Sequence, residues 1–150
     1  MAIKNYIEKY LKVSFLYAIL AMVGGIFYRE FTKFNGFYGK TTLSVVHTHY
    51  FILGMFIFLI LLLIEKNFHI SDDKLIKKTV FYQIGLNITV LAFLMRGICQ
   101  TLEMNISKGF DAGISGIAGI GHILIGMSLI LILIDIRKKI IASDNLIKES

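Results

Sequence analysis

The sequence of 150 residues is about one domain long, and its composition differs strongly from that of a soluble protein. Hydrophobic residues make up 56% of the chain and charged residues only 17%, with a mean hydropathy of +0.73. A soluble fold of this size could not bury so much apolar surface, and a single cysteine, Cys99, excludes a disulfide scaffold. The composition therefore predicts an integral membrane protein with one domain over residues 1–150.

Four stretches are long and apolar enough to cross a bilayer as helices, which takes about 20 residues each. In chain order we expect spans at residues 7–28, 43–64, 80–98 and 114–134. Their continuous apolar runs do not fit the short alternating strands of a membrane β-barrel. Because the chain contains no proline, kinked helices are not expected. The predicted fold is an all-α four-helix bundle.

Lysine and arginine are distributed unevenly between the two sides of these spans. Counted with the residues at the span ends, the N-terminal end holds three (Lys4, Lys9 and Lys12), the second connection four and the C-terminal segment four. The first connection holds three, and the third holds two (Arg96 and Lys108). The positive-inside rule then places both termini in the cytoplasm and predicts an up-down-up-down topology. The net charge of +6 indicates anionic lipid as the partner at the cytoplasmic face, and no basic stretch has the motif of a nucleic-acid-binding protein.

Each predicted helix has one line of small and polar residues, spaced three and four positions apart, that share a face. On the fourth helix this line consists of Ala112, Ser115, Gly119, His122 and Gly126. Small residues let helices approach closely in a bilayer, so we expect these lines to be the packing seams of the bundle. Packing does not explain ionisable side chains in the outer half of the bilayer, which are costly there unless they are paired or face a cavity.

Three histidines and one arginine lie at that depth: His47 and His49 in the second span, Arg96 in the third and His122 in the fourth. At about 100° per residue, His47 and His49 point to nearly opposite faces, so both cannot serve one small centre. His47 shares the small-residue face with Gly54, whereas the height of His49 matches that of His122 more closely. The sequence leaves open which of the two pairs with His122.

Two imidazoles that face one another inside an apolar bundle are typical axial ligands of haem iron. Small residues near the histidines would leave room for the macrocycle, namely Gly54, Gly119 and Gly126. Polar residues toward the outer ends of the helices would contact the propionates by charge-assisted hydrogen bonds, namely Arg96, Arg29 and Tyr28. Because no Cys-x-x-Cys-His motif is present, the expected cofactor is non-covalent haem b.

The strings from Tyr28 to Met55 and from Gly121 to Met127 resemble a family of small four-helix membrane proteins of Gram-positive bacteria. That family long carried only a domain-of-unknown-function label, and within it the chain resembles haem-sensing membrane proteins of clostridia. The resemblance covers the whole chain. It implies haem binding in the bacterial plasma membrane, for sequestration or sensing of haem and protection against haem or oxidative stress.

A more distant similarity concerns the His-x-His pattern of His47 and His49 alone. In haem–copper oxidase subunit I such a pair ligates two haems on opposite faces of one helix. The similarity allows two haems, or a haem at the interface of a homodimer. It does not imply oxygen reduction, because the remaining oxidase ligands are absent from the sequence.

Three other functions fit the sequence less well. A bare zinc or copper ion would need further ligands, because no carboxylate lies at the depth of the histidines. A small-solute or metal-ion transporter would need a polar pathway to both sides, and the cytoplasmic half of the second span is wholly apolar. An accessory membrane subunit would use its glycine faces to pack against a partner. Two axial ligands leave iron no open position, so an enzyme is not expected, although a single ligand would leave that question open.

Overall fold

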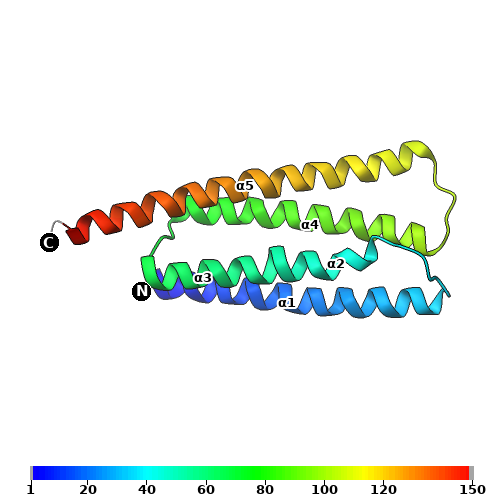
Figure 1. The fold of residues 1–150 in the computed structure, drawn as a ribbon, viewed down its shortest axis with the longest axis horizontal. Helices are drawn as coiled ribbons and strands as arrows, with labels where there is room; N and C mark the ends of the chain where they lie inside the picture. The colour runs from blue at the N-terminus through cyan, green and yellow to red at the C-terminus, as the bar shows by residue number, and fades with distance from the viewer. Residues whose placement is uncertain (1, 149–150) are drawn as a thin grey trace.

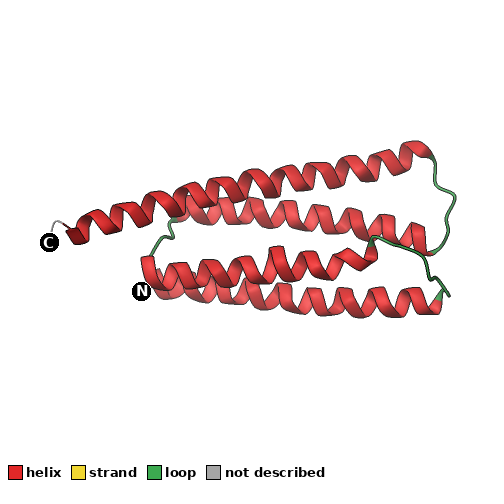
Figure 2. Ribbon diagram, viewed as in Figure 1, coloured by secondary structure: helices red, strands yellow, loops and turns green. Residues whose placement is uncertain are grey.

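The computed structural model describes residues 2–148, with side chains for residues 5–142. These residues form helices and connections without any strand, so the expected all-α fold is confirmed. The helices are α1 (Ala2–Phe34), α2 (Leu43–His49), the π-helix η1 (Tyr50–Phe56), α3 (Ile57–Phe68), α4 (Asp73–Thr101) and α5 (Lys108–Lys148). Because α2, η1 and α3 follow one another without a break, they make one rod, and four rods run along the long axis (Figures 1 and 2).

Each rod contains a segment long and apolar enough to cross a membrane: Asn5–Phe34, Leu43–Phe68, Asp73–Thr101 and Lys108–Ala142. All four overlap the predicted spans and extend beyond them. The fourth begins at Lys108, so the glycines that follow are helical although glycine is a poor helix former in water. In apolar surroundings a backbone without internal hydrogen bonds costs more than a glycine in a helix, which explains the extension.

The second rod is irregular at mid-length, where Tyr50–Phe56 adopt a π-helix. Neighbouring side chains bind carbonyl oxygens of this segment: the Tyr82 hydroxyl donates to Leu53 O at 2.8 Å, and the Ser14 hydroxyl donates to Met55 O at 3.1 Å. The wider turn arises without a proline, and hydrogen bonds from α1 and α4 accompany it.

The helices α4 and α5 pack closely against one another at two glycines. A Cβ atom at Gly121 would lie 2.8 Å from the backbone nitrogen of Thr89, and one at Gly85 would lie 2.9 Å from the carbonyl oxygen of Gly121. The buried line of α5 runs through Ile114, Ala118, Gly121, Ile125 and Ser128. The expected seam on the fourth helix was therefore wrong: close packing follows a neighbouring face, and the line through Gly119 and His122 is largely exposed.

Polar side chains tie α5 to the rest of the bundle at the end where α4 begins. Lys78 of α4 pairs with Asp135 of α5 at 2.5 Å, and Lys139 pairs with Asp72 at 2.8 Å. Asp72 also caps α4 by accepting a hydrogen bond from Leu75 N at 2.8 Å. The hydrogen bond from Lys139 and that from Leu75 hold the pKa of Asp72 below its ordinary value. These contacts fix the register of α5 along α4.

Candidate functional site

Two of the three candidate histidines lie close together. The ring centroids of His49, at the end of α2, and His122, in α5, are 6.2 Å apart, with an angle of 89° between the rings. Phe93 of α4 lies beside both rings, with centroid separations of 4.9 Å from His49 and 5.8 Å from His122. The fold thus brings the imidazole of His49, from the rod formed by α2, η1 and α3, next to the imidazole of His122 in α5, and both lie beside α4.

Each of these imidazoles is oriented by its own helix. Nδ1 of His49 lies 2.8 Å from Val45 O, and Nδ1 of His122 lies 2.8 Å from Ala118 O. A carbonyl oxygen only accepts hydrogen bonds, so each Nδ1 carries the proton and donates it, and Nε2 of the neutral ring keeps a free lone pair. Metal-binding histidines are commonly held in this way, with one nitrogen on a carbonyl and the other on the metal.

The separation of the two rings suits a single metal centre between them. A metal–imidazole bond is about 2 Å long and a ring nitrogen lies about 1.1 Å from the ring centre, so imidazoles on opposite sides of one ion have centroids about 6 Å apart. The observed distance is 6.2 Å. Within the described residues, no group of three or more His, Cys, Asp or Glu side chains is placed to hold a metal ion. The pair would therefore leave the other positions of the ion to a non-protein ligand such as a macrocycle.

Open space adjoins His122 along α5. Gly119 and Gly126 lie one turn before and one turn after it, and a Cβ atom at either position would meet no heavy atom within 4 Å. Gly54 is different, because a Cβ atom there would lie 2.7 Å from Cβ of Tyr17. Its missing side chain makes room for Tyr17 and not for a ligand, so the expectation for Gly54 was wrong.

The space directly between the imidazoles is partly filled by Phe93. The centroids of Phe93, His49 and His122 form a nearly equilateral triangle, so the phenyl ring stands beside the midpoint between the two imidazoles, within the radius of a porphyrin. Phe93 is only half-buried. A flat ligand placed between the two imidazoles would need the space that Phe93 occupies.

His47 lies on the other side of its helix, against α1. A Cβ atom at Gly25 would lie 3.7 Å from Cβ of His47, which shows how closely the two helices approach here. Nδ1 of His47 is buried and has no hydrogen-bond partner within residues 5–142. The structure thus brings His49, and not His47, to His122, as the comparison of heights indicated and the comparison of faces did not.

Arg96 lies one turn beyond Phe93 on α4 and binds the start of α5. Its Nη2 lies 2.9 Å from Asp111 Oδ1, 2.9 Å from Asp111 O and 2.5 Å from Ser115 Oγ. The sequence did not indicate Asp111 as a partner, although an acidic residue in the first turn of the fourth helix was the available signal. Phe93 was also missed, because an apolar residue within an apolar span carries no signal in the sequence.

Arg29 and Tyr28 are not brought to the histidine pair. Both belong to α1, which packs on α2, η1 and α3 and lies on the opposite side of the bundle from α5 (Figure 1). Arg29 is exposed and pairs with its neighbour Glu30 at 3.6 Å. That these two side chains contact a ligand of His122 stays a prediction.

A family model matches residues 7–139 of the chain. The chain belongs to DUF2871, a family described as "Protein of unknown function". The matched part of this DUF2871 chain includes His49, Phe93, Arg96 and His122. No curated protein and no solved structure matches it. The function must therefore be argued from the site.

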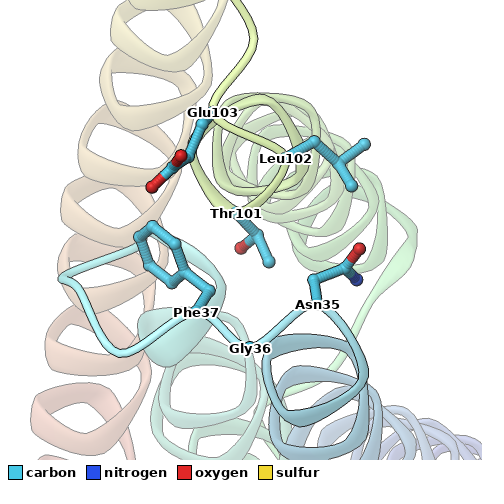
Figure 3. Close-up of a pocket in the computed structure, with 6 residues that line it drawn as sticks. All are labelled: Asn35, Gly36, Phe37, Thr101, Leu102 and Glu103. Atoms are coloured by element: carbon cyan, nitrogen blue, oxygen red, sulfur yellow. The ribbon is translucent and has the colours of Figure 1, made fainter.

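A hollow of the DUF2871 chain, with a volume of about 260 Å³, lies where α4 ends. It is lined by Asn35, Gly36, Phe37, Thr101, Leu102 and Glu103 (Figure 3). Thr101 is the last residue of α4, and Glu103 follows it in a left-handed conformation with φ of 49°. The hollow shares no lining residue with the histidine pair, so the two are separate features.

Proposed function

We propose that this DUF2871 chain is a membrane haem-binding protein that holds non-covalent haem b between His49 and His122. The observation that carries the proposal is the 6.2 Å separation of two imidazoles whose Nδ1 atoms are each held by a carbonyl oxygen. Both Nε2 atoms are then free to bind iron as neutral ligands. Bound in this way, the iron supplies one-electron redox chemistry with no open position for a substrate.

The other residues of the site have complementary roles in this proposal. Gly119 and Gly126 leave space along α5 for the edge of the macrocycle, and Phe93 rotates to admit it. Arg96 binds a propionate by charge-assisted hydrogen bonds. His47 faces α1 and is not a ligand, so one haem binds to each chain.

We place the chain in a bacterial plasma membrane, up-down-up-down, with both termini in the cytoplasm. The excess of lysine and arginine in the second connection and the two terminal segments supports this orientation. In Figure 1, α1 begins and α5 ends at the same end of the bundle, which agrees with it. The histidine pair then lies in the outer half of the bilayer, and the basic residues contact anionic lipid at the cytoplasmic face.

The proposed role is sequestration or sensing of haem, with protection against haem or oxidative stress. Two protein ligands saturate the iron, which suits storage or sensing better than oxygen chemistry. The resemblance to haem-sensing membrane proteins of clostridia supports the same role.

A visible spectrum tests the haem proposal. The protein is purified from cells supplied with haem, and oxidised and reduced spectra are recorded. A sharp reduced α-band is expected for the unmodified protein and for His47→Ala, which is the matched control from the same helix. His49→Ala and His122→Ala should each lose the band, because each leaves iron with one protein ligand. A protein without haem absorbance contradicts the cofactor, and loss of the band in His47→Ala but not in His49→Ala contradicts the ligand assignment.

A second candidate is a site for a bare soft metal ion, which belongs to a metal-ion transporter rather than a haem protein. This second candidate is favoured by Phe93, whose ring lies 4.9 Å from His49 and 5.8 Å from His122 and so occupies space that a macrocycle would need. Equilibration of haem-free protein with Zn²⁺ or Cu⁺, followed by metal analysis, distinguishes the two. One ion per chain in the unmodified protein and none in His122→Ala, without any haem spectrum, would support the metal site.

A further inference from the structure

The hydrogen-bond donors of Arg96 are unevenly matched to acceptors. Nη2 carries two hydrogens, yet three acceptors surround it: Asp111 Oδ1 at 2.9 Å, Asp111 O at 2.9 Å and Ser115 Oγ at 2.5 Å. Nε carries one hydrogen, is buried and has no partner within the described side chains. A buried donor without an acceptor costs about 1–3 kcal/mol. The edge of the guanidinium formed by Nε and Nη2 is therefore only half used: three acceptors crowd Nη2 and none reaches Nε.

That edge has the geometry of a carboxylate site. A carboxylate facing Nε and Nη2 makes two parallel charge-assisted hydrogen bonds, and it would supply the acceptor that Nε lacks. Asp111 occupies only Nη2 and leaves this bidentate arrangement unmade. An incoming carboxylate thus gains one hydrogen bond over the contact that it replaces.

The position of this edge agrees with a ligand of the histidine pair. Ser115 and His122 are seven residues apart on the same face of α5, which is about 10 Å at 1.5 Å per residue. This distance is close to the reach from the iron of a haem to its propionate carboxylates. Arg96 is also one turn from Phe93, the side chain beside both imidazoles.

Asp111 can be released from Arg96 at low cost. Its side chain is 53% exposed, compared with 24% for Arg96, so water can solvate the free carboxylate. Asp111 also lies in the first turn of α5, where the helix dipole favours a negative charge without any cation beside it. Arg96, which is more buried, depends more on an anionic partner than Asp111 depends on a cation.

We propose that Asp111 is an internal carboxylate that occupies Arg96 in the ligand-free chain and is displaced by a carboxylate of the ligand. The site thereby selects porphyrins with ionised propionates over neutral porphyrins. This selectivity rests on the proposed haem function and names Asp111 as a competitor for Arg96. Asp111 is a specificity-determining residue that touches Arg96, while His49 and His122 bind the iron.

Titration with two porphyrins tests this proposal. Haem and haem dimethyl ester, which lacks free carboxylates, are titrated separately into purified haem-free protein, and each affinity is measured by absorbance. The unmodified protein should bind haem at least about tenfold more tightly than the ester, since hydrogen bonds to charged groups contribute about 1.5–3 kcal/mol. Arg96→Gln should bring this ratio close to that of the two porphyrins' partitioning into empty micelles.

Asp111→Asn distinguishes a competitor from a structural residue. It should bind haem about two- to fivefold more tightly than the unmodified protein, the range expected from loss of an exposed ion pair, and bind the ester unchanged. Asp135→Asn is the matched control, because it removes a different ion pair between α4 and α5 and should change neither affinity.

Three outcomes would overturn the proposal. Equal affinity of the unmodified protein for haem and for the ester, corrected for partitioning, shows that no carboxylate is recognised, and this comparison needs no variant. Unchanged or weaker haem binding by a folded Asp111→Asn shows that Asp111 does not compete. In both cases the His49–His122 site can still stand. Failure of the unmodified protein to bind either porphyrin instead removes the haem function itself.

Discussion

Single glycines of α5 have opposite roles, although they look alike in the sequence. A Cβ atom at Gly121 would lie 2.8 Å from the backbone nitrogen of Thr89, and a backbone atom cannot move aside as a side chain can. At Gly113 a Cβ atom would meet no heavy atom within 4 Å. The first glycine permits the close approach of α4 and α5, and the second leaves a surface open.

Gly121→Ala should therefore destabilise the protein and Gly113→Ala should not. The added methyl group at position 121 forces the two helices apart, at a cost of about 1–3 kcal/mol in the free energy of unfolding. At position 113 alanine meets no neighbour and is the better helix former, so stability should stay the same or rise by up to about 1 kcal/mol. Unfolding by sodium dodecyl sulfate in mixed micelles, followed by circular dichroism, measures both. Equal stabilities of the two variants would contradict the close contact at Gly121.

At the scale of the helix, the π-helix η1 lies directly after His49 and depends on hydrogen bonds from its neighbours. Tyr82 is fully buried, and its hydroxyl donates to Leu53 O at 2.8 Å. Tyr82→Phe removes this donor and leaves a carbonyl oxygen of the widened turn without it in an apolar interior, at a cost of about 1–3 kcal/mol. We expect lower stability together with weaker haem binding, because relaxation of η1 turns His49 relative to α5.

The control for this prediction is Tyr38→Phe, which removes a hydroxyl from a side chain that is 99% exposed. Unfolding in mixed micelles and haem titration are measured for both variants. A Tyr82→Phe protein that is destabilised but binds haem normally would show that η1 contributes to stability without orienting His49.

The four spans could be predicted from the sequence because long apolar runs have few alternatives, but their inward faces could not. A helix surrounded by lipid is apolar all round, so the contrast between faces that identifies the core side of a soluble helix is weak. Small residues were the remaining signal, and they mark contacts with particular neighbours. Gly54 accommodates Tyr17 of α1. The small-residue face on which both His47 and Gly54 lie therefore packs against α1.

The candidate site was predicted in part for a similar reason. His122 and Arg96 stand out because ionisable residues within a bilayer are costly. Asp111 lies outside the predicted spans, and its contact with Arg96 depends on how α5 packs on α4. Phe93 matters only because it lies beside both imidazoles. Such relationships between helices are set by tertiary packing, which the pattern of one helix does not contain.

At the scale of the whole molecule, the arrangement of the rods explains why the His122 face is open. α5 packs mainly on α4 and to a lesser extent on α3, while α1 lies on the opposite side of the bundle (Figure 1). Ion pairs tie α5 to α4 toward both ends, Arg96–Asp111 at one and Lys78–Asp135 at the other. Between these two ion pairs, Gly119 and Gly126 leave the surface of α5 around His122 open. A flat ligand such as the proposed haem could enter there from the side of the bundle.

The orientation of the bundle decides from which side such a ligand arrives, and it can be tested with single cysteines. Cys99 is the only cysteine, so Cys99→Ser provides a cysteine-free background. In that background Tyr38→Cys lies in the connection before α2, and Asn67→Cys lies near the end of α3; both positions are exposed. A membrane-impermeant maleimide should label Tyr38→Cys in intact cells, and Asn67→Cys only after permeabilisation, because the positive-inside rule assigns the lysine-rich connection to the cytoplasm.

If Asn67→Cys were labelled in intact cells and Tyr38→Cys were not, both the proposed topology and the proposed function would have to be revised. His49 is the last residue of α2, near the connection that contains Tyr38, so the histidine pair lies toward the same side of the membrane as that connection. With Tyr38 outside, the proposed haem site would lie where haem arriving from the surroundings enters the bilayer. With Tyr38 inside, the same site faces haem released in the cytoplasm, and the protein would take up an internal excess of haem rather than intercept an external one.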